Sequence, residues 1–560
     1  MALIKLSNKK KRRLLELADR AMVLAGQGQD VAAHGLCAQA DSEYKDYPDI
    51  MYARGLIAST QQDYATASVW FGRAYQAAPK RVEFKANYAG CLLMQHEVEK
   101  AGELYRQALA QSPHLTELAY GYGAALASMG EFRQAIQVLD KALIRDPRNV
   151  ALLKKLATTH SELAENEVSL ALLGKAHAVA PGDTGVLYEM GVYLVQLGEL
   201  EQARSRFREV RKLDAHHVES LAMLINSGSY DEREADVAAM REIYDQAEQG
   251  SEAQIVAAFV LGSVADRSGQ FNLAFEYWSE GNYQRRLTLA YDEAEQALLH
   301  QAAANAFPAA RFVEGAGGES SAEAPLFIVG MPRSGSTLLE QALSRHPALQ
   351  AAGEMYAMQQ SIVGRKRKVL NPRLIEQLTS LDDDGVLTVG REYTRCLTQQ
   401  YGLKGRVIDK ALNNYLYAGL IAKAIPEARI IHVRREPMAS CLSMFQQDFV
   451  NVLPYAFELE EMGRQYARYE ELMQHWREVL PAGVMIEVDY EDLVVNPEVE
   501  LRRLLQACGL DWHEDCLNAH EAGNVVTTSS RFQVRRPIHQ QSVARWKHYE
   551  QELAPFRRCR

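Results

Sequence analysis

A glycine-containing loop at residues 330–337 has the residue types and spacing of an anion site. It reads Gly330-Met-Pro-Arg-Ser-Gly335-Ser-Thr337, follows the apolar run PLFIVG (325–330) and opens a helical pattern. The N–H groups and dipole at the start of a helix attract anions, and Arg333 adds a guanidinium suited to phosphate or sulfate. The layout is that of a P-loop, but Ser336 stands where nucleotide triphosphatases need a lysine. We therefore expect an anion site without coupled hydrolysis of a nucleoside triphosphate.

A second arginine and a serine follow another predicted strand. In RIIHVRREPMASCLSMF (429–445), the strand ends at the turn Arg435-Glu436-Pro437, and Ser443 lies eight residues after Arg435 on the next helix. Arg435 offers paired donors, and Ser443 offers a hydroxyl two helical turns further on. We expect both side chains to converge on one phosphate, distinct from the phosphate held by the first loop.

The two motifs together resemble those of the sulfotransferases. Pro332 to Thr337 match that family's phosphosulfate-binding loop, P-x-S-G-[ST]-[ST], and the R-x-P turn with its downstream serine matches the family's 3′-phosphate motif. The resemblance implies 3′-phosphoadenosine 5′-phosphosulfate (PAPS) as the sulfuryl donor, with no metal. It implies that the donor is bound by Arg333, Ser334, Gly335, Ser336, Thr337, Arg435, Ser443, Tyr490, Arg536 and Arg545.

Further residues resemble the protein-tyrosine branch of that family. The run from Ser344 to Pro347, followed by Gly353-Glu354, is similar to the end of the first helix in that branch. By this resemblance Glu354 is the candidate base that takes a phenol proton, a role that a positioned carboxylate can fill. The resemblance also implies that Arg333, Lys410 and Ser530 belong to the catalytic set.

The C-terminal part of the chain extends the resemblance and also departs from it. Tyr490 lies where the family has a nucleotide-contacting tyrosine, and Ser530, Arg536 and Arg545 belong to a segment that resembles the one folding over the nucleotide. The departures put the acceptor, more than the donor, in question. They are Gln447 in place of an arginine, Leu412 in place of a proline, and Arg531-Phe532 between Ser530 and Gln533.

The elements that must position these residues are alternating strands and helices. Short apolar runs at 325–330, 406–409, 429–433 and 484–488 are separated by helical stretches such as 336–345 and 437–446. Such alternation predicts an α/β, P-loop-like domain with a central parallel sheet, whose ligands lie at the carboxyl ends of the strands. The motifs fall at those ends. We expect His432, inside a strand, to be a core residue, and the acidic run 382–384 to cap a helix or face solvent without binding a metal.

The N-terminal half repeats every 34 residues. Pro79, Pro113, Pro147 and Pro181 are each 34 positions apart, which is the tetratricopeptide period. In register with them lie small residues (Gly55, Ala89, Gly123, Ala157, Gly191) and groove-filling residues (Phe71, Tyr105, Leu139, Leu173, Phe207). We expect an all-α tetratricopeptide superhelix of about six repeats over 1–217, further helices with degenerate repeats over 218–312, a linker over 313–324 and the sulfotransferase-like domain over 325–560.

Composition excludes several classes of protein. The net charge of -10 disfavours a nucleic-acid binder, because such binding depends on neutralising phosphates. The longest run of apolar or small residues, Ile255–Ala265, is half of the ~20 residues that span a bilayer, so we expect no membrane span. The N-terminus has no secretory signal pattern, and seven scattered cysteines without a CxxC pair argue against disulfides or zinc. These features favour the cytoplasm, and tetratricopeptide arrays joined to such domains resemble a bacterial arrangement.

These observations lead to a PAPS-dependent sulfotransferase that acts on tyrosine of a protein or peptide, with the array binding a protein or peptide partner. One alternative is sulfation of a carbohydrate or small hydroxyl compound, with the array serving assembly, for example into a homo-oligomer. Another is a scaffold that binds nucleotide without transfer. The set Arg333, Glu354, Lys410, Arg435 and Ser443 argues against the scaffold.

Overall fold

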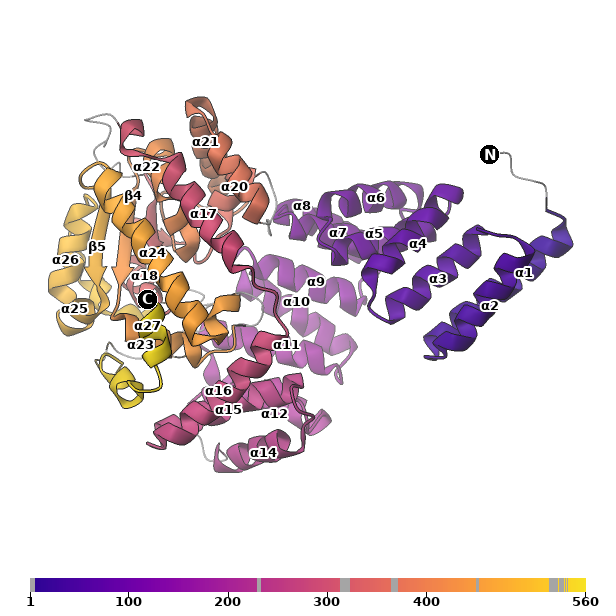
Figure 1. Cartoon of the computed structure of the whole chain (residues 1–560), viewed down its shortest axis with the longest axis horizontal. Coiled ribbons are helices and arrows are strands. Elements are labelled where there is room, and N and C mark those ends of the chain that lie inside the picture. The colour runs from indigo at the N-terminus through magenta and orange to yellow at the C-terminus, as the bar shows by residue number, and fades with distance from the viewer. Residues whose placement is uncertain are drawn as a thin grey trace. The chain divides into compact units, whose positions relative to one another are not determined.

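Two compact units make up the chain (Figure 1). The computed structural model describes residues 6–228, 233–312, 323–363, 371–449, 453–522, 532, 538, 540 and 542–560. Helices α1–α10 form the first unit, which ends at Val179, and the elements from α11 onward form the second. No helix within the described ranges is both long enough and apolar enough to span a bilayer.

The first unit is built of consecutive helices that pack against their neighbours in sequence. Its helices are α1 (Asn8–Gly26), α2 (Asp30–Glu43), α3 (Pro48–Thr60), α4 (Tyr64–Ala77), α5 (Val82–Met94), α6 (Val98–Gln111), α7 (Thr116–Ser128), α8 (Phe132–Arg145), α9 (Val150–Ser161) and α10 (Asn166–Val179). A Cβ on Gly55 would lie 2.6 Å from the ring of Phe71, and one on Gly123 would lie 2.7 Å from Leu139. The two helices of a repeat therefore approach so closely at both positions that a Cβ would overlap the side chain of the partner helix.

Helix pairs continue into the second unit, where they precede the sheet. They are α11 (Thr184–Leu197), α12 (Leu200–Leu213), α13 (Val218–Asn226), α14 (Arg233–Gln246), α15 (Glu252–Arg267), α16 (Phe271–Leu287) and α17 (Glu293–Ala306). A Cβ on Gly191 of α11 would lie 2.4 Å from the ring of Phe207. A Cβ on Gly262 of α15 would likewise lie 2.4 Å from the ring of Trp278 in α16. The α15–α16 pair therefore repeats the local packing of a tetratricopeptide repeat, as its sequence indicated.

A parallel sheet of five strands, in the order β2-β3-β1-β4-β5, is the centre of the α/β part. The strands are β1 (Leu326–Val329), β2 (Leu349–Ala351), β3 (Arg406–Asp409), β4 (Arg429–Arg434) and β5 (Met485–Asp489), and every paired neighbour is parallel. Four of these strands were predicted from the sequence. The three-residue edge strand β2 was not, because its length gives no periodic signal.

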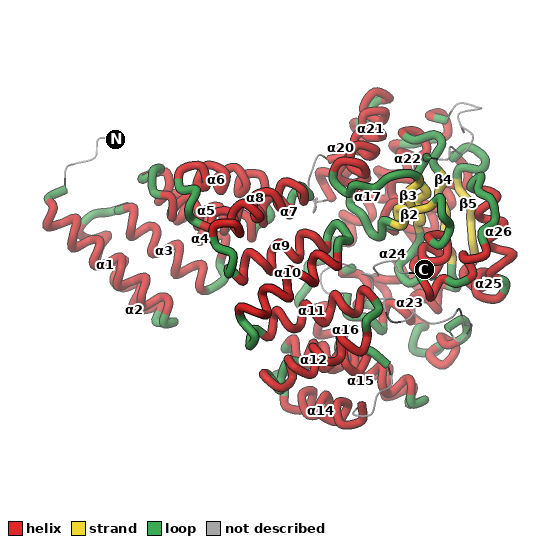
Figure 2. The backbone as a smooth tube through the Cα atoms, turned by 180° about the vertical axis from the view of Figure 1, so that it is seen from behind, coloured by secondary structure: helices red, strands yellow, loops and turns green. Residues whose placement is uncertain are grey.

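Helices enclose the sheet, whose strands are drawn in yellow in Figure 2. They are α18 (Ser336–Ser344), α19 (Ala357–Val363), α20 (Asn371–Ser380), α21 (Asp383–Gln399), α22 (Ala418–Ala424), α23 (Pro437–Phe445), α24 (Leu459–Val479), α25 (Tyr490–Val495), α26 (Pro497–Ala507) and α27 (Ala554–Cys559). Asp382 caps α21 by accepting a hydrogen bond from the N–H of Gly385, as expected for the acidic run.

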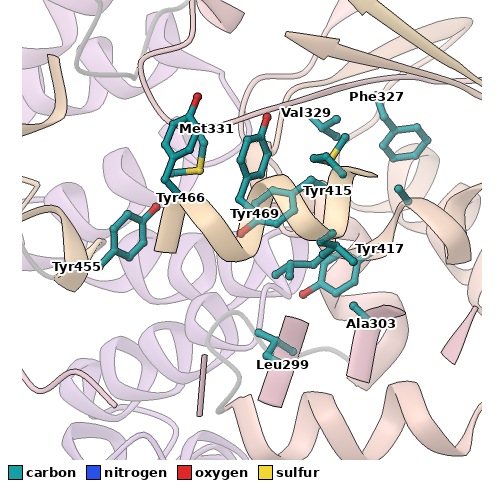
Figure 3. Packing of buried hydrophobic residues seen from close by; sticks show 14 of the residues in the cluster. Leu299, Ala303, Phe327, Val329, Met331, Tyr415, Tyr417, Tyr455, Tyr466 and Tyr469 are labelled. Carbon is teal, nitrogen blue, oxygen red and sulfur yellow. The ribbon is translucent and has the colours of Figure 1, made fainter. Parts of the chain in front are cut away.

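Alternate residues of β1 enter two different cores, because successive side chains of a strand point to opposite faces. Leu326 and Ile328 pack with residues of α18 and α26. Phe327 and Val329 pack on the other face, in a cluster that includes Tyr415, Tyr417, Tyr466 and Tyr469 (Figure 3). Both faces of the sheet are therefore covered, which fits the nearly continuous apolar character of its strands.

The second of these cores also contains residues from α15, α16 and α17. Phe259, Trp278 and Phe307 are at most 5% exposed and belong to the same cluster as Phe327. Phe275 of α16 stacks on Phe445 of α23, with ring centroids 5.3 Å apart. Helices α15–α17 are thus part of the hydrophobic core of the α/β part.

This shared core predicts how fragments of the chain behave. A fragment of residues 325–560 lacks Phe259, Trp278 and Phe307, so we expect it to lose cooperative unfolding, whereas residues 180–560 keep the core and unfold cooperatively. Circular dichroism with thermal melting of both fragments measures the difference. Equal melting temperatures for the two fragments would contradict the prediction.

Candidate functional site

The sheet brings the predicted site residues to one edge. Since all the strands are parallel, the segments that follow them leave at the same, carboxyl, end of the sheet. Gly330 follows β1, Lys410 follows β3 and Arg435 follows β4, and β1 lies between β3 and β4 in the sheet. The site is therefore assembled around the end of the central strand.

Two glycines let the first loop adopt its shape. A Cβ on Gly330 (φ 154°) would lie 2.6 Å from the backbone oxygen of Val433 in β4. Gly335 (φ 100°) is the N-cap of α18, and a Cβ there would lie 2.2 Å from Tyr490. Arg333 itself has a left-handed backbone, with φ 67°. A non-glycine residue in this region is unusual and costs energy, and such positions cluster at functional sites.

Side chains from the two predicted anion motifs meet. Arg333 donates from Nε to Ser443 Oγ at 3.0 Å. Arg435 donates from Nη1 to the backbone oxygen of Arg333 at 2.8 Å. The structure thus brings Arg333, Arg435 and Ser443 together, and the last two come from β4–α23 as expected.

The same cluster has polar atoms without partners. Ser334 Oγ and Arg435 Nε are both buried, and neither has a hydrogen-bond partner among the described residues. Ser336 and Thr337 are also buried, at the start of α18. Buried donors without partners carry a desolvation cost that a bound acceptor would remove. Hydroxyl and guanidinium donors at a helix start form a set that fits an oxyanion.

Electrostatics point to the same kind of ligand. Burial, followed by the neighbouring charge of Arg435, lowers the pKa of the Arg333 guanidinium to about 10. Burial also lowers the pKa of Arg435. Both shifts mean that the charged forms are poorly solvated here, and an anion between them would restore the lost stabilisation. The two arginines are therefore poised for a ligand of negative charge.

Tyr490 and Ser542 form the wall beside Arg435. The Arg435 guanidinium lies over the Tyr490 ring, with 4.6 Å between Cζ and the ring centroid, and its Nη2 donates to the backbone oxygen of Ser542 at 3.0 Å. The hydroxyls of Tyr490 and Ser542 are 2.7 Å apart. A cavity of about 490 Å³ also borders Arg435, with Arg434, Tyr466 and Tyr469 in its lining.

Lys410 and Glu354 meet on the other side of β1. Lys410 Nζ lies 2.7 Å from Glu354 Oε1; the lysine is fully buried, while the Glu354 side chain is about half exposed. The backbone N–H of Lys410 also donates to the oxygen of Gly353 at 3.0 Å, which extends the β2–β3 pairing to the turn before Glu354. The half-exposed carboxylate is open to a ligand, and the buried lysine holds it by an ion pair.

Two buried acidic residues were missed in the sequence, one close to Lys410 in space and one next to it in the chain. Glu340 of α18 is 3% exposed, accepts from the N–H of Gly353 at 2.9 Å and lies 3.9 Å from Lys410 Nζ. Asp409 accepts from the hydroxyl of Tyr393 at 3.0 Å, and burial raises its pKa to about 7. The sequence pattern predicts that Glu340 lies in the helix after the loop. It contains no signal that this side chain lies close to Lys410.

The remaining predicted residues have different surroundings. Arg545 begins a short 3-10 helix, η6 (Arg545–Tyr549), and is paired with Asp266 of α15, which also accepts from the Tyr549 hydroxyl at 2.6 Å. Asp266 is a further residue that the sequence did not reveal. His432 is 1% exposed in β4, and its core role is confirmed. Ser530 and Arg536 lie outside the described residues.

Comparisons with known proteins match two regions of the chain. The model of the sulfotransferase family matches residues 325–514. Residues 325–514 form a sulfotransferase-family domain. A tetratricopeptide-repeat model matches residues 93–158, so the sulfotransferase domain follows tetratricopeptide repeats in this chain.

The relatives that match parts of the chain are distant in sequence. The chain is 27% identical over 387 residues to an uncharacterized protein of Aquifex aeolicus (strain VF5), which covers 67% of this chain and 50% of that protein. It is 26% identical over 262 residues to protein-tyrosine sulfotransferase 1 of Danio rerio, a match that covers 40% of this chain and 65% of that protein. The chain thus spans half to two thirds of these relatives. A solved thermophilic tetratricopeptide protein of Thermus thermophilus is 18% identical, covers 35% of this chain and all of that one, and has a TM-score of 0.29.

Two glycine substitutions distinguish the cost of a positive φ alone from the cost of a positive φ combined with a steric overlap. Gly335→Ala adds a Cβ overlapping Tyr490 at a positive φ, whereas Gly353→Ala adds one with nothing within 4 Å at φ 67°. We expect Gly353→Ala to lower the free energy of unfolding by about 1 kcal/mol and Gly335→Ala by about 2–4 kcal/mol, since overpacking adds to strain. Urea denaturation measures both values. Equal losses of unfolding free energy in the two variants would contradict the prediction, because they would mean that Tyr490 moves aside at no energetic cost.

Proposed function

We propose that this protein is a PAPS-dependent sulfotransferase that transfers a sulfuryl group to the hydroxyl of tyrosine in a protein or peptide. The observation that carries the proposal is the convergence of Arg333, Arg435 and Ser443 beside the start of α18. The sulfotransferase-family domain supports the reaction class. The tyrosine acceptor is supported by the names of relatives such as that of Danio rerio.

The donor would be held by two separate sets of groups. In the first set, Arg333, the buried hydroxyl of Ser334 and the first residues of α18 would bind the 5′-phosphosulfate. The second set, Arg435 and Ser443 at the end of β4 and on α23, would bind the 3′-phosphate. Tyr490, which stacks under Arg435, would keep this guanidinium in place and form one wall for the nucleoside.

Group transfer would then occur in front of the Glu354–Lys410 pair. Glu354 accepts the phenol proton as the phenol oxygen bonds to sulfur, and the bond from sulfur to the bridging phosphate oxygen breaks, leaving its electron pair on the phosphate. Arg333 and Lys410 stabilise the negative charge that grows on the sulfuryl and phosphate oxygens. Both cations are held by protein contacts before the donor arrives, so little reorganisation is needed.

The tetratricopeptide repeats would bind a protein partner. Repeats of this kind present successive equivalent helices, and such surfaces are suited to extended polypeptides. Binding of the acceptor protein there would raise its local concentration at the sulfotransferase domain. The array would therefore affect apparent acceptor affinity rather than donor affinity.

Donor binding tests the first part of the proposal. We expect PAPS, or adenosine 3′,5′-bisphosphate as its desulfo product, to bind without magnesium and much more tightly than ATP, which lacks the 3′-phosphate. Arg435→Ala should cost about 2–4 kcal/mol of donor binding, because it removes a charge-assisted contact in a buried site. Isothermal titration calorimetry measures these affinities.

A neighbouring arginine provides the matched control for this measurement. Arg434 is the preceding residue, but its guanidinium pairs with Asp489 at 2.7 and 2.9 Å. Arg434→Ala should leave donor affinity within about threefold of the original. Equal affinity for ATP and PAPS, or equal losses from the two alanine variants, would contradict the donor assignment.

Transfer itself tests the role of Glu354 and the acceptor. We expect Glu354→Gln to keep donor binding but to lower the transfer rate by ~10² to 10⁴, the usual contribution of a positioned base. The assay follows label from radiolabelled PAPS into tyrosine-containing peptides and, in parallel, into oligosaccharides. Label found only in the oligosaccharides would reject the tyrosine acceptor, and an unchanged rate in the variant would place the base elsewhere.

A further inference from the structure

We propose that Glu340 is a positioning residue that holds both Lys410 and the Gly353–Glu354 turn in place for transfer. The inference rests on the proposed function, because it assigns Glu340 to the residues expected to do the chemistry. Glu340 comes from α18, whose N-terminus forms the anion loop, and its side chain reaches the segments that follow β2 and β3. One side chain thereby connects three separate segments of the site.

The contacts of Glu340 are those of a support and not of a reacting group. It is 3% exposed and its side chain faces Gly353 and Lys410, whereas Glu354 is about half exposed and is the carboxylate open to an arriving acceptor. One carboxylate oxygen accepts from the N–H of Gly353 at 2.9 Å. That hydrogen bond fixes the residue immediately before Glu354 and hence the direction in which Glu354 leaves the sheet.

The other carboxylate oxygen acts on Lys410 at a distance. It lies 3.9 Å from Nζ, which is too long for a hydrogen bond but close enough for strong attraction where water is excluded. Lys410 therefore keeps its N–H groups for other partners, one of which is Glu354 at 2.7 Å. An ammonium that is held electrostatically but retains its donors suits a lysine that must bind a sulfuryl or phosphate oxygen.

The location of Glu340 is costly for stability, which argues for a role beyond packing. Burial raises the pKa of its carboxyl group, while the charge of Lys410 and the hydrogen bond from Gly353 favour the ionised form. A buried ion pair is on average no more stabilising than apolar residues of the same volume. A glutamate at this position of α18 therefore has little structural advantage over an apolar residue, and the position of Lys410 is what it changes.

The test uses the full-length protein and two measurements on Glu340→Gln, which keeps the size and an acceptor for Gly353 but removes the charge. We expect the transfer rate at saturation to fall by about 10- to 100-fold with donor affinity unchanged within about threefold, since a small misplacement of a catalytic group can cost ~10² in rate. We also expect Lys410 to be acetylated faster by acetic anhydride than in the original protein, because the lysine is no longer held in its buried position by the Glu340 carboxylate. Peptide mass spectrometry measures the labelling, with Lys423 as internal reference.

Glu461→Gln is the matched control. Glu461 also forms a partly buried pair, with Arg286 at 2.7 and 2.8 Å, but it does not contact Lys410 in any described interaction. We expect this variant to lose thermal stability without a change in transfer rate or in Lys410 labelling. A merely structural Glu340 would behave like Glu461, and that result would overturn the proposal.

Two other results are possible: the Glu340→Gln variant does not fold, or the original protein shows no transfer. If Glu340→Gln does not fold, Glu340→Asp is measured instead; we expect faster Lys410 labelling and partial transfer, and labelling equal to that of the original protein would overturn the proposal. If the original protein transfers no sulfuryl group to any acceptor, the proposed function fails. Labelling of Lys410 still reports whether Glu340 holds it, so the two failures are distinguishable.

Discussion

The hydrogen bond from the Arg435 guanidinium to the backbone oxygen of Arg333 joins the two anion motifs, and the rest of the site depends on it. This contact requires β1 and β4 to be adjacent parallel strands, so that their loops leave at the same edge. It also requires the loop to approach β4 closely, which Gly330 permits because it has no Cβ. Arg333 accepts the strain of a positive φ in this arrangement, and its side chain then reaches Ser443.

The central strand separates two electrostatic environments. On the β4 side, two arginines with lowered pKa values form a positive region, where Ser334 Oγ and Arg435 Nε have no hydrogen-bond partner among the described residues. On the β3 side, Lys410 lies near the carboxylates of Glu340 and Glu354. The first environment favours binding an anion, and the second places a lysine and a carboxylate beside it. A group that passes from a phosphate to an acceptor would lie between the two.

Local patterns in the sequence were enough to predict the loop, the R-x-P turn, four strands and the repeat geometry. Each of these has a signal within a few residues, such as the glycine spacing of the loop or the small residues that face Phe71 and Leu139. Glu340, Asp266 and β2 were missed for a common reason. Their roles arise only from contacts between distant segments, as when Glu340 meets Gly353 and Lys410 or Asp266 meets Arg545.

Helix α16 joins the end of the repeat-like region to the segment that carries the second anion motif. Its Asn282 donates to the backbone oxygen of Phe445, the last residue of the helix that carries Ser443, at 2.7 Å. Its Arg285 bridges Glu252 of α15 and Asp448, just after that helix. Asp266 of α15 pairs with Arg545. Ser542, three residues before Arg545, contacts both Arg435 and Tyr490. A displacement of α15–α16 would therefore be transmitted to Ser443 and Arg435 through buried polar contacts, since packed interiors transmit strain.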